Sequence, residues 1–316
     1  MPQREDRVGR PASPDGDSGL SRLLAILGPT ASGKTDVTVA LAQRIGAEVI
    51  SVDSMQVYRG MNIGTAKPTT IERRGVVHHM VDIVEPDVDY SVADFRVAGR
   101  KIIEAADGPL IISGGSGLHF RALVDPMTFA PTDAELRAEL EAADGDDLVR
   151  ELQDADPQAS LHVDLANNRR VVRAVEILRI TGETPSGRAA SAEAEDVRRY
   201  KPELEFTAIG LDPGSDLEQR VSTRLDEMRR GGLVQEVRGL VGRMGRTASG
   251  AVGYREILDH LGGRSSEDEA FKAIGRNTRR LAKKQRTWFQ RDPRIRWIPW
   301  FEESEQRTER AMEALS

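Results

Sequence analysis

Short apolar runs alternate with segments of helical periodicity over the first 125 residues of the chain. Each apolar run suits a buried strand, and apolar residues at three- and four-residue spacing indicate helices between the strands. The predicted strands span residues 23–27, 49–52, 77–84 and 110–113, and the predicted helices span 35–45 and 92–106. This alternation indicates an α/β fold, in which a parallel sheet carries helices on both faces.

The hydrophobic pattern changes after about Asp125. No strand is predicted within 126–200, which contains helical stretches at 134–142 and 169–180 and a polar segment, 181–199, predicted to begin as a loop. An apolar run follows at 206–211, and helices are predicted at 216–230 and 232–243. We therefore divide the chain into a disordered tail (1–21), a first core part (22–125), a helical insertion (126–200) and a second core part with basic C-terminal helices (201–316).

Composition is that of an ordinary soluble globular protein, with 39% hydrophobic and 30% charged residues. The absence of cysteine excludes disulfides and thiolate metal sites. No apolar run approaches the roughly 18 residues of a membrane helix, and the N-terminal segment lacks the apolar region of a secretory signal. We therefore expect a cytoplasmic monomer that makes no contact with a membrane.

Charge is unevenly distributed along the chain. The formal net charge of −6 argues against a purely electrostatic nucleic-acid binder. Between residues 276 and 296, however, there are nine basic residues and a single acidic residue, Asp292. This concentration leaves a nucleic-acid surface possible.

Residues 28–35 read GPTASGKT and match the phosphate-binding pattern G-x-x-x-x-G-K-[ST]. The glycines let backbone N–H groups turn toward phosphate oxygens, Lys34 adds a positive charge, and the Thr35 hydroxyl can ligate Mg²⁺. A strand is predicted before the motif and a helix after it, which favours a phosphate cradle over a chance Gly-rich turn. The cradle residues are Gly28, Pro29, Thr30, Ala31, Ser32, Gly33, Lys34 and Thr35.

The cradle alone does not define a reaction. Phosphoryl transfer normally also uses an acid after an apolar strand to hold Mg²⁺, but the strand at 110–113 leads into Gly114, Gly115 and Ser116. Asp53 does follow a strand directly, and at the carboxyl end of that strand it would face the crevice that holds the cradle. Asp53 is therefore either a functional carboxylate or a turn residue. The hypothesis that the protein is a kinase is supported by the cradle alone. A non-catalytic RNA-binding module is a further alternative.

Several motifs together resemble the tRNA dimethylallyltransferases, also called tRNA isopentenyltransferases. They are GPTASGKT, SVDSMQVYRGMNIGTAKP, the Gly114–Gly115–Ser116 turn, AVGYREIL and RNTRRLAKKQRTWF, in the family's order over roughly residues 22–300. The resemblance implies a P-loop NTPase-like parallel sheet core with a helical insertion domain. It also implies transfer of a dimethylallyl group from its diphosphate to N6 of adenosine 37, in tRNAs that read codons beginning with U.

The resemblance assigns a role to each motif. The cradle would hold the diphosphate as a leaving group, with Mg²⁺ on Thr35, and Arg255 matches the family's diphosphate-contacting arginine. Asp53 matches the general base that accepts the N6 proton. The segment that continues from Asp53 matches adenine contacts: Ser54, Met55 and Gln56. The adenosine would have to be flipped out of the anticodon stem-loop to reach these residues.

Two positions depart from the family pattern. Ser116 stands where the family has the threonine of Gly-Gly-Thr, and His119 stands where a tyrosine is common. In the insertion, RRVVR matches the family's tRNA-contacting segment, and Arg137 aligns with a further tRNA contact. The RRVVR residues are Arg169, Arg170, Val171, Val172 and Arg173. Arg170 and Arg173 share a helix face, as phosphate contacts require, although a solvated helix face would look the same.

Three further patterns complete the sequence predictions. An apolar stripe within 271–288 predicts packing, while the basic residues beside it favour RNA phosphates; the stripe is Phe271, Ile274, Leu281 and Trp288. His78 and His79 are not expected to bind a metal together, because neighbouring strand residues point to opposite faces.

A prenyltransferase acting on free adenine nucleotides is a rival function. The basic segments 169–173 and 276–296 argue against it, since a small nucleotide needs no such surface.

Overall fold

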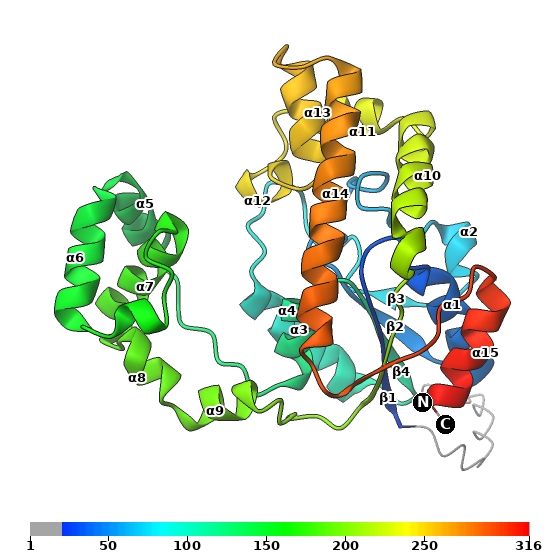
Figure 1. Ribbon diagram of the computed structural model, residues 1–316, viewed down its shortest axis with the longest axis horizontal. Coiled ribbons are helices and arrows are strands. Elements are labelled where there is room, and N and C mark those ends of the chain that lie inside the picture. Colours follow the sequence, from blue (N-terminus) through cyan, green and yellow to red (C-terminus); the bar gives the residue numbers. More distant parts are fainter. Residues whose placement is uncertain (1–20, 316) are drawn as a thin grey trace, which may run out of the picture.

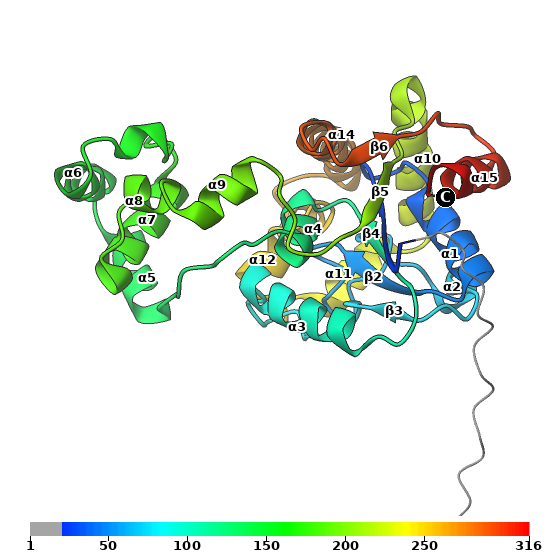
Figure 2. The same ribbon diagram turned by 90° about the horizontal axis from the view of Figure 1, so that it is seen from below.

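The computed structural model describes residues 21–315. The tail predicted at 1–21 therefore lies, apart from Ser21, outside the described residues. Figures 1 and 2 show two lobes, a sheet-containing core and a smaller helical lobe that two connecting segments join to it. None of the described helices is long and apolar enough to cross a membrane.

Six parallel strands form the sheet, in the order β3-β2-β4-β1-β5-β6. They are β1 (Leu23–Leu27), β2 (Glu48–Val52), β3 (His78–His79), β4 (Leu110–Gly114), β5 (Thr207–Gly210) and β6 (Ile295–Trp297). β1 is buried on both faces, which explains its continuous apolar run. Its register with β4 and β5 brings Leu27 beside Gly114 and Gly210, so the ends of these three strands lie at one edge.

Helices cover both faces of the sheet, as predicted. The helices of the first core part are α1 (Lys34–Ile45), α2 (Thr70–Arg73), α3 (Val92–Ala105) and α4 (Gly117–Val124). On one face α1 packs with the C-terminal helix α15 (Ser304–Leu315) over Leu24 and Ile26 of β1. On the other face α3 and α4 pack over Leu23 and Leu27. The two sides of β1 therefore feed two separate apolar clusters.

The strand predicted at residues 77–84 is wrong in length. Only His78 and His79 pair with β2, and Val84 makes an isolated bridge to Tyr58. Met80 and Asp82 have φ of 62° and 56°, in the left-handed region, and this turns the chain away from the sheet. The histidines take separate partners, since His78 Nδ1 lies 3.0 Å from the Val76 carbonyl and His79 Nε2 lies 2.7 Å from Glu48.

The segment 126–200 folds as a helical lobe with its own small core. Its helices are α5 (Ala134–Ala142), α6 (Gly145–Ala155), η1 (Ala159–Leu161), α7 (Asn168–Thr181), α8 (Pro185–Ala189) and α9 (Ala192–Arg198). The loop predicted at the start of 181–199 is confirmed at residues 182–184, and α8 and α9 occupy most of the remainder of that segment. Thr184 and Ser191 cap these helices, accepting hydrogen bonds from Gly187 N and Ala194 N.

The second core part adds a helical layer that stands above the sheet edge (Figure 1). It comprises η2 (Gly214–Asp216), α10 (Leu217–Arg230), α11 (Leu233–Leu240), α12 (Arg246–Ser249), α13 (Tyr254–Leu261) and the 24-residue α14 (Glu267–Gln290). α14 packs between α10 and α13 and reaches down to α4. α10 and α14 therefore form walls over the edge where β1, β2 and β4 end.

Candidate active site

The GPTASGKT loop joins β1 to α1. Gly28 has φ of 153°, and a Cβ there would lie 2.1 Å from the Leu211 carbonyl oxygen, so the turn requires glycine. Lys34 Nζ donates to the Pro29 carbonyl at 2.5 Å and to Ser32 Oγ at 3.2 Å. The Thr35 hydroxyl has no hydrogen-bond partner within residues 21–315 and lines the cleft beside the loop. The loop thus has the curled form of a phosphate cradle.

Two arginines of α10 close over this cradle. Arg220 Nε donates to the Ala31 carbonyl at 2.6 Å, and Arg224 donates to Thr30 Oγ1 at 3.0 Å. Burial, together with the neighbouring Arg224 guanidinium, lowers the pKa of Lys34 to about 7, against the opposing effect of Asp53. Sequence reasoning missed both arginines. Their four-residue spacing on the predicted helix 216–230 was the available signal.

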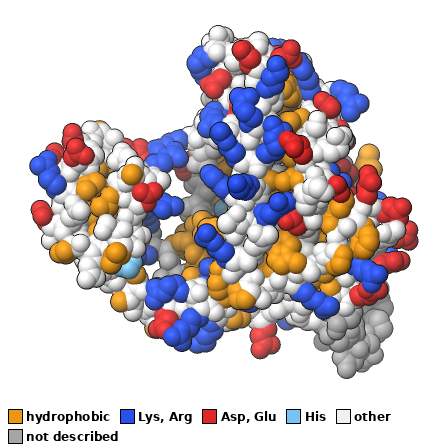
Figure 3. All heavy atoms as spheres, in the orientation of Figure 1, with side chains coloured by type: hydrophobic (Ala, Val, Ile, Leu, Met, Phe, Trp, Pro, Cys, Tyr) orange, Lys and Arg blue, Asp and Glu red, His pale blue; other side chains and the backbone are white. Residues whose placement is uncertain are grey.

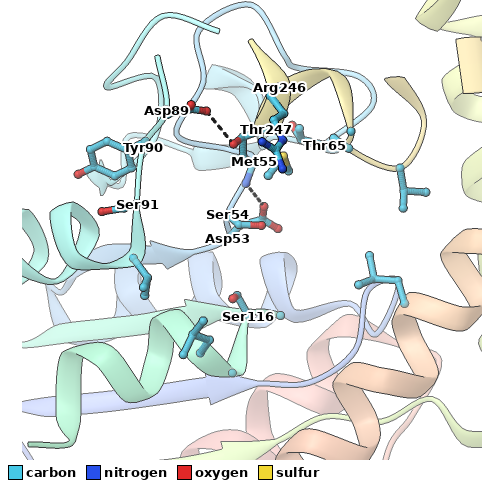
Figure 4. Close-up of a pocket in the computed structure, with 18 of the residues that line it drawn as sticks. Asp53, Ser54, Met55, Thr65, Asp89, Tyr90, Ser91, Ser116, Arg246 and Thr247 are labelled. Atoms are coloured by element: carbon cyan, nitrogen blue, oxygen red, sulfur yellow. Dashed lines mark hydrogen bonds between the residues drawn. The ribbon is translucent and has the colours of Figure 1, made fainter. Parts of the chain in front are cut away.

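Asp53 lies immediately beyond the carboxyl end of β2. Its Oδ1 accepts hydrogen bonds from the backbone N–H groups of Met55 (2.8 Å) and Gln56 (3.3 Å), and Oδ2 has no partner in the described part of the chain. Figure 4 shows the carboxylate with its bond to Met55. The Gln56 amide is itself held, accepting from Ser51 Oγ and donating to the Thr65 carbonyl. Asp53 is therefore fixed in orientation with one oxygen free to take a proton.

Ser116 and His119 form a second polar pair at the same sheet edge (Figure 4 labels Ser116). The Ser116 N–H donates to the Val52 carbonyl at 3.0 Å, which places Ser116 beside the residue before Asp53. Ser116 Oγ lies 2.7 Å from His119 Nδ1, and the imidazole stands edge-on to Phe95. Burial lowers the pKa of His119, with Asp53 opposing, so the ring is neutral at pH 7 and holds the serine hydroxyl.

Two clefts meet at this edge. The P-loop cleft, about 850 Å³, is lined by the cradle, and the inter-lobe cleft, about 1310 Å³, lies between the core and the helical lobe. Both clefts share a lining of seven described residues: Thr30, Asp53, Thr65, Gly115, Arg224, Met228 and Gln285. Gln285 of α14 accepts from Thr30 N at 2.8 Å and also approaches Gly115. We call this shared lining the junction.

Basic side chains surround the inter-lobe cleft. Figure 3 shows Lys and Arg side chains flanking the hollow between the lobes, with hydrophobic side chains at its base. The basic residues that line it are Arg137, Arg169, Arg173, Arg224, Arg246 and Lys284. Arg246 of α12 also connects the core to the helical lobe, because its Nη1 atom lies 2.6 and 2.7 Å from the two carboxylate oxygens of Glu141 in α5.

The residues of the RRVVR segment lie on different faces of α7. Arg169, Val172 and Arg173 line the inter-lobe cleft, whereas Arg170 is exposed outside that lining. Val171 is 1% exposed and belongs to the core of the helical lobe, so it is not placed to touch RNA. The predicted pairing of Arg170 with Arg173 on one working face is therefore not supported by the geometry.

Arg137 and Arg173 both form ion pairs with Glu176, which is fully buried. Arg173 donates to Glu176 at 2.7 Å and to the carbonyls of Ala130 (2.7 Å) and Pro131 (2.9 Å). Asp133 N also donates to Glu176, at 3.0 Å. These contacts tie the segment that enters the lobe to α7.

Arg255 is not brought to the cradle. It lies at the start of α13, outside the lining of both clefts, and pairs with Glu256 at 3.0 Å. Its neighbour Tyr254 is buried and donates to Glu236, which directs Arg255 to the exposed side of the helix. The arginines of α10 that the structure places beside the cradle are Arg220 and Arg224.

The apolar stripe of α14 is only partly core. Phe271 and Ile274 are buried as predicted, but Leu281 and Trp288 are 38% and 45% exposed and line the inter-lobe cleft. The Trp288 ring lies so close to Gly117 that a Cβ at 117 would come within 1.9 Å of it. The packing prediction is therefore wrong for Leu281 and Trp288.

Residues 56–292 match the model of the family described as "IPP transferase". The chain belongs to the IPP transferase family. It is 42% identical over 297 residues to a tRNA dimethylallyltransferase of Thermobifida fusca, covering 89% of this chain and 91% of that protein. A relative of the same name from Bifidobacterium animalis subsp. lactis is 40% identical, with 88% and 82% covered.

Solved structures agree with this membership. The full-length tRNA isopentenylpyrophosphate transferase of Bacillus halodurans has 36% identity and a TM-score of 0.67, covering 92% of this chain and 94% of that one. A eukaryotic dimethylallyltransferase described as acting on tRNA has a TM-score of 0.77 at 24% identity, covering 93% and 78%. This second likeness extends the shared fold to a distant relative. The predicted P-loop NTPase-like α/β core is confirmed.

Proposed function

We propose that this IPP transferase family member transfers a dimethylallyl group from dimethylallyl diphosphate to N6 of adenosine 37, in tRNAs that read codons beginning with U. The observation that carries the proposal is the junction, where Asp53 lines both the cleft that holds the phosphate cradle and the inter-lobe cleft. The similar proteins are tRNA dimethylallyltransferases and a tRNA isopentenylpyrophosphate transferase, which supports the same reaction class.

The P-loop cleft suits the diphosphate. Lys34, Arg224 and the inward N–H groups of the cradle supply positive charge where the leaving group gains negative charge. The open Thr35 hydroxyl at the start of α1 fits Mg²⁺, which commonly takes one or two protein oxygens and completes its shell with phosphate and water. Bound there, Mg²⁺ would neutralise the diphosphate. We propose Arg224, in place of Arg255, as the arginine that contacts the diphosphate.

Asp53 suits the role of general base. The N6 lone pair is delocalised into the adenine ring, so removal of a proton assists its attack. A bond forms between N6 and C1 of the dimethylallyl group, the bond from C1 to the diphosphate oxygen breaks with its electron pair leaving on diphosphate, and the N6 proton passes to Asp53. Oδ2 is the receiving atom, because Oδ1 is occupied by two backbone N–H groups.

The inter-lobe cleft suits the anticodon stem-loop. A base flipped from an RNA loop can enter the cleft while phosphates meet the basic rim, with Arg169 and Lys284 on opposite lobes. A small adenine nucleotide would leave the basic residues around the inter-lobe cleft without a binding partner. This disfavours the hypothesis of a prenyltransferase that acts on free adenine nucleotides. One chain supplies both clefts, so we propose that the protein acts as a monomer, in the cytoplasm where tRNA is found.

A labelling experiment tests the proposal. The protein is incubated with Mg²⁺, radiolabelled dimethylallyl diphosphate and one acceptor: unmodified tRNA, the same tRNA with guanosine at position 37, AMP or ATP. Label should enter only the unmodified tRNA. Label on AMP or ATP would support the rival prenyltransferase, and brisk ATP hydrolysis abolished by Lys34→Ala would support a kinase or ATPase.

A further inference from the structure

The junction is almost entirely polar. Of the seven described residues that line both clefts, Thr30, Asp53, Thr65, Arg224 and Gln285 carry polar side chains and Gly115 carries none. Met228 alone presents a long apolar side chain. It is half-buried, and it packs against the larger apolar cluster under α10, α13 and α14.

The group that is transferred must pass through the junction. In the proposed function, the diphosphate occupies the P-loop cleft and the adenine occupies the inter-lobe cleft. The five-carbon group then lies between them, in contact with the residues that belong to both clefts. An apolar group gains binding energy there only from an apolar neighbour, since burial beside unpaired polar groups is unfavourable.

α10 holds Met228 at a fixed position relative to the cradle. Arg224 and Met228 are four residues apart, so they share one helix face and stand about 6 Å apart along the axis. The Arg224 bond to Thr30 fixes the height of this face above the cradle. The hydrocarbon group of a donor whose diphosphate is held at Arg224 therefore comes within reach of Met228.

We propose that Met228 contacts the dimethylallyl group and determines the length of prenyl donor that the enzyme accepts. This inference rests on the proposed function. The thioether side chain adapts to the branched end of a five-carbon group. With RNA in the inter-lobe cleft, a ten-carbon donor would need the space that Met228 fills.

The test compares dimethylallyl diphosphate with geranyl diphosphate as donors to unmodified tRNA. The full-length chain is assayed as wild type, Met228→Ala, Met228→Val and the matched control Met244→Ala, since Met244 packs against the same apolar cluster but lines neither cleft. Wild type should prefer the five-carbon donor. In Met228→Ala the ratio of kcat/KM values, geranyl over dimethylallyl, should rise at least about tenfold, a typical discrimination by an apolar pocket. Met228→Val should shift it less, and Met244→Ala should leave it unchanged.

A binding measurement separates this inference from other defects. Inorganic diphosphate should bind all four proteins equally in calorimetry, because the cradle is untouched, while dimethylallyl diphosphate should lose affinity in Met228→Ala. If wild type labels no tRNA, the proposed function fails. If wild type is active but the donor ratio is unchanged in Met228→Ala, or in Met228→Val should the alanine variant not fold, Met228 does not set donor length. Wild type that uses both donors equally would also overturn the inference.

Discussion

A basic residue in the inter-lobe cleft, where we propose that tRNA binds, can either contact RNA or stabilise the helical lobe, and replacing Arg173 with alanine tests which role applies. Its guanidinium makes three hydrogen bonds, to Glu176 and to the Ala130 and Pro131 carbonyls, so we expect Arg173→Ala to act mainly on stability. Arg169, four residues earlier, lines the same cleft without a side-chain partner among the described residues. Arg169→Ala is therefore the matched control.

The expected magnitude follows from the burial of Glu176. Removing one partner of a fully buried charge costs about 3–5 kcal/mol. Arg137 remains as a second partner, so we expect the free energy of unfolding to fall by about 3 kcal/mol, the lower end of that range. Arg169→Ala should change stability by less than about 0.5 kcal/mol. It should instead flatten the dependence of log affinity for tRNA on log salt by about 0.7–0.9, the loss of one phosphate contact.

The assay is urea unfolding followed by circular dichroism, paired with tRNA binding between 50 and 200 mM salt. Arg173→Ala with wild-type stability and a slope reduced by one full contact would refute this reasoning, because the guanidinium would then face RNA. Acid adds a check. Burial raises the pKa of Glu176, but the bonds from Arg137 and Arg173 outweigh it and hold the pKa below its usual value. Its stabilisation should be complete above about pH 4.3 and be lost as pH falls through the lowered pKa.

Three further predictions follow from the core. Asp53→Ala should slow single-turnover prenyl transfer by about 10²–10⁴-fold while donor affinity stays near wild type, and near-normal transfer would remove Asp53 from the mechanism. Thr35→Ala should lower transfer in a way that higher Mg²⁺ partly relieves, and a defect insensitive to Mg²⁺ would argue against a metal there. Asp125→Ala should lower the unfolding free energy by about 3–5 kcal/mol in denaturation experiments, because this fully buried carboxylate pairs with Arg121 and Arg294; wild-type stability would contradict that estimate.

Local sequence signals predicted most of the core. Apolar runs located β1, β2 and β4, and the GPTASGKT motif located the cradle, because each depends on residues adjacent in sequence. The strand at 77–84 was predicted too long, since left-handed turns at Met80 and Asp82 leave no periodic signal. α8 and α9 were missed because their caps, Thr184 and Ser191, stand within a polar stretch that resembles a loop.

The candidate site was harder to predict, because its residues come from distant segments. Arg224 reaches Thr30 across 194 positions of sequence, so nothing near either residue indicates the contact. Trp288 continues the spacing of Phe271 on α14, and only the position of α4 decides that its ring faces a cleft. Arg173 looked like a surface cation because the buried Glu176 that engages it is visible only once the lobe is folded.

The helical lobe leaves and re-enters the core at nearly one point. The Val124 carbonyl accepts hydrogen bonds from Glu203 N at 2.7 Å and Leu204 N at 3.2 Å, so the exit and return segments are direct neighbours. A tight turn could join them with the strand order unchanged, and the cradle, Asp53 and Met228 all lie outside the excised stretch. Such an arrangement permits recombination at a single locus: one ancestral core could acquire, exchange or lose the helical lobe without any change to the residues of the phosphate cradle.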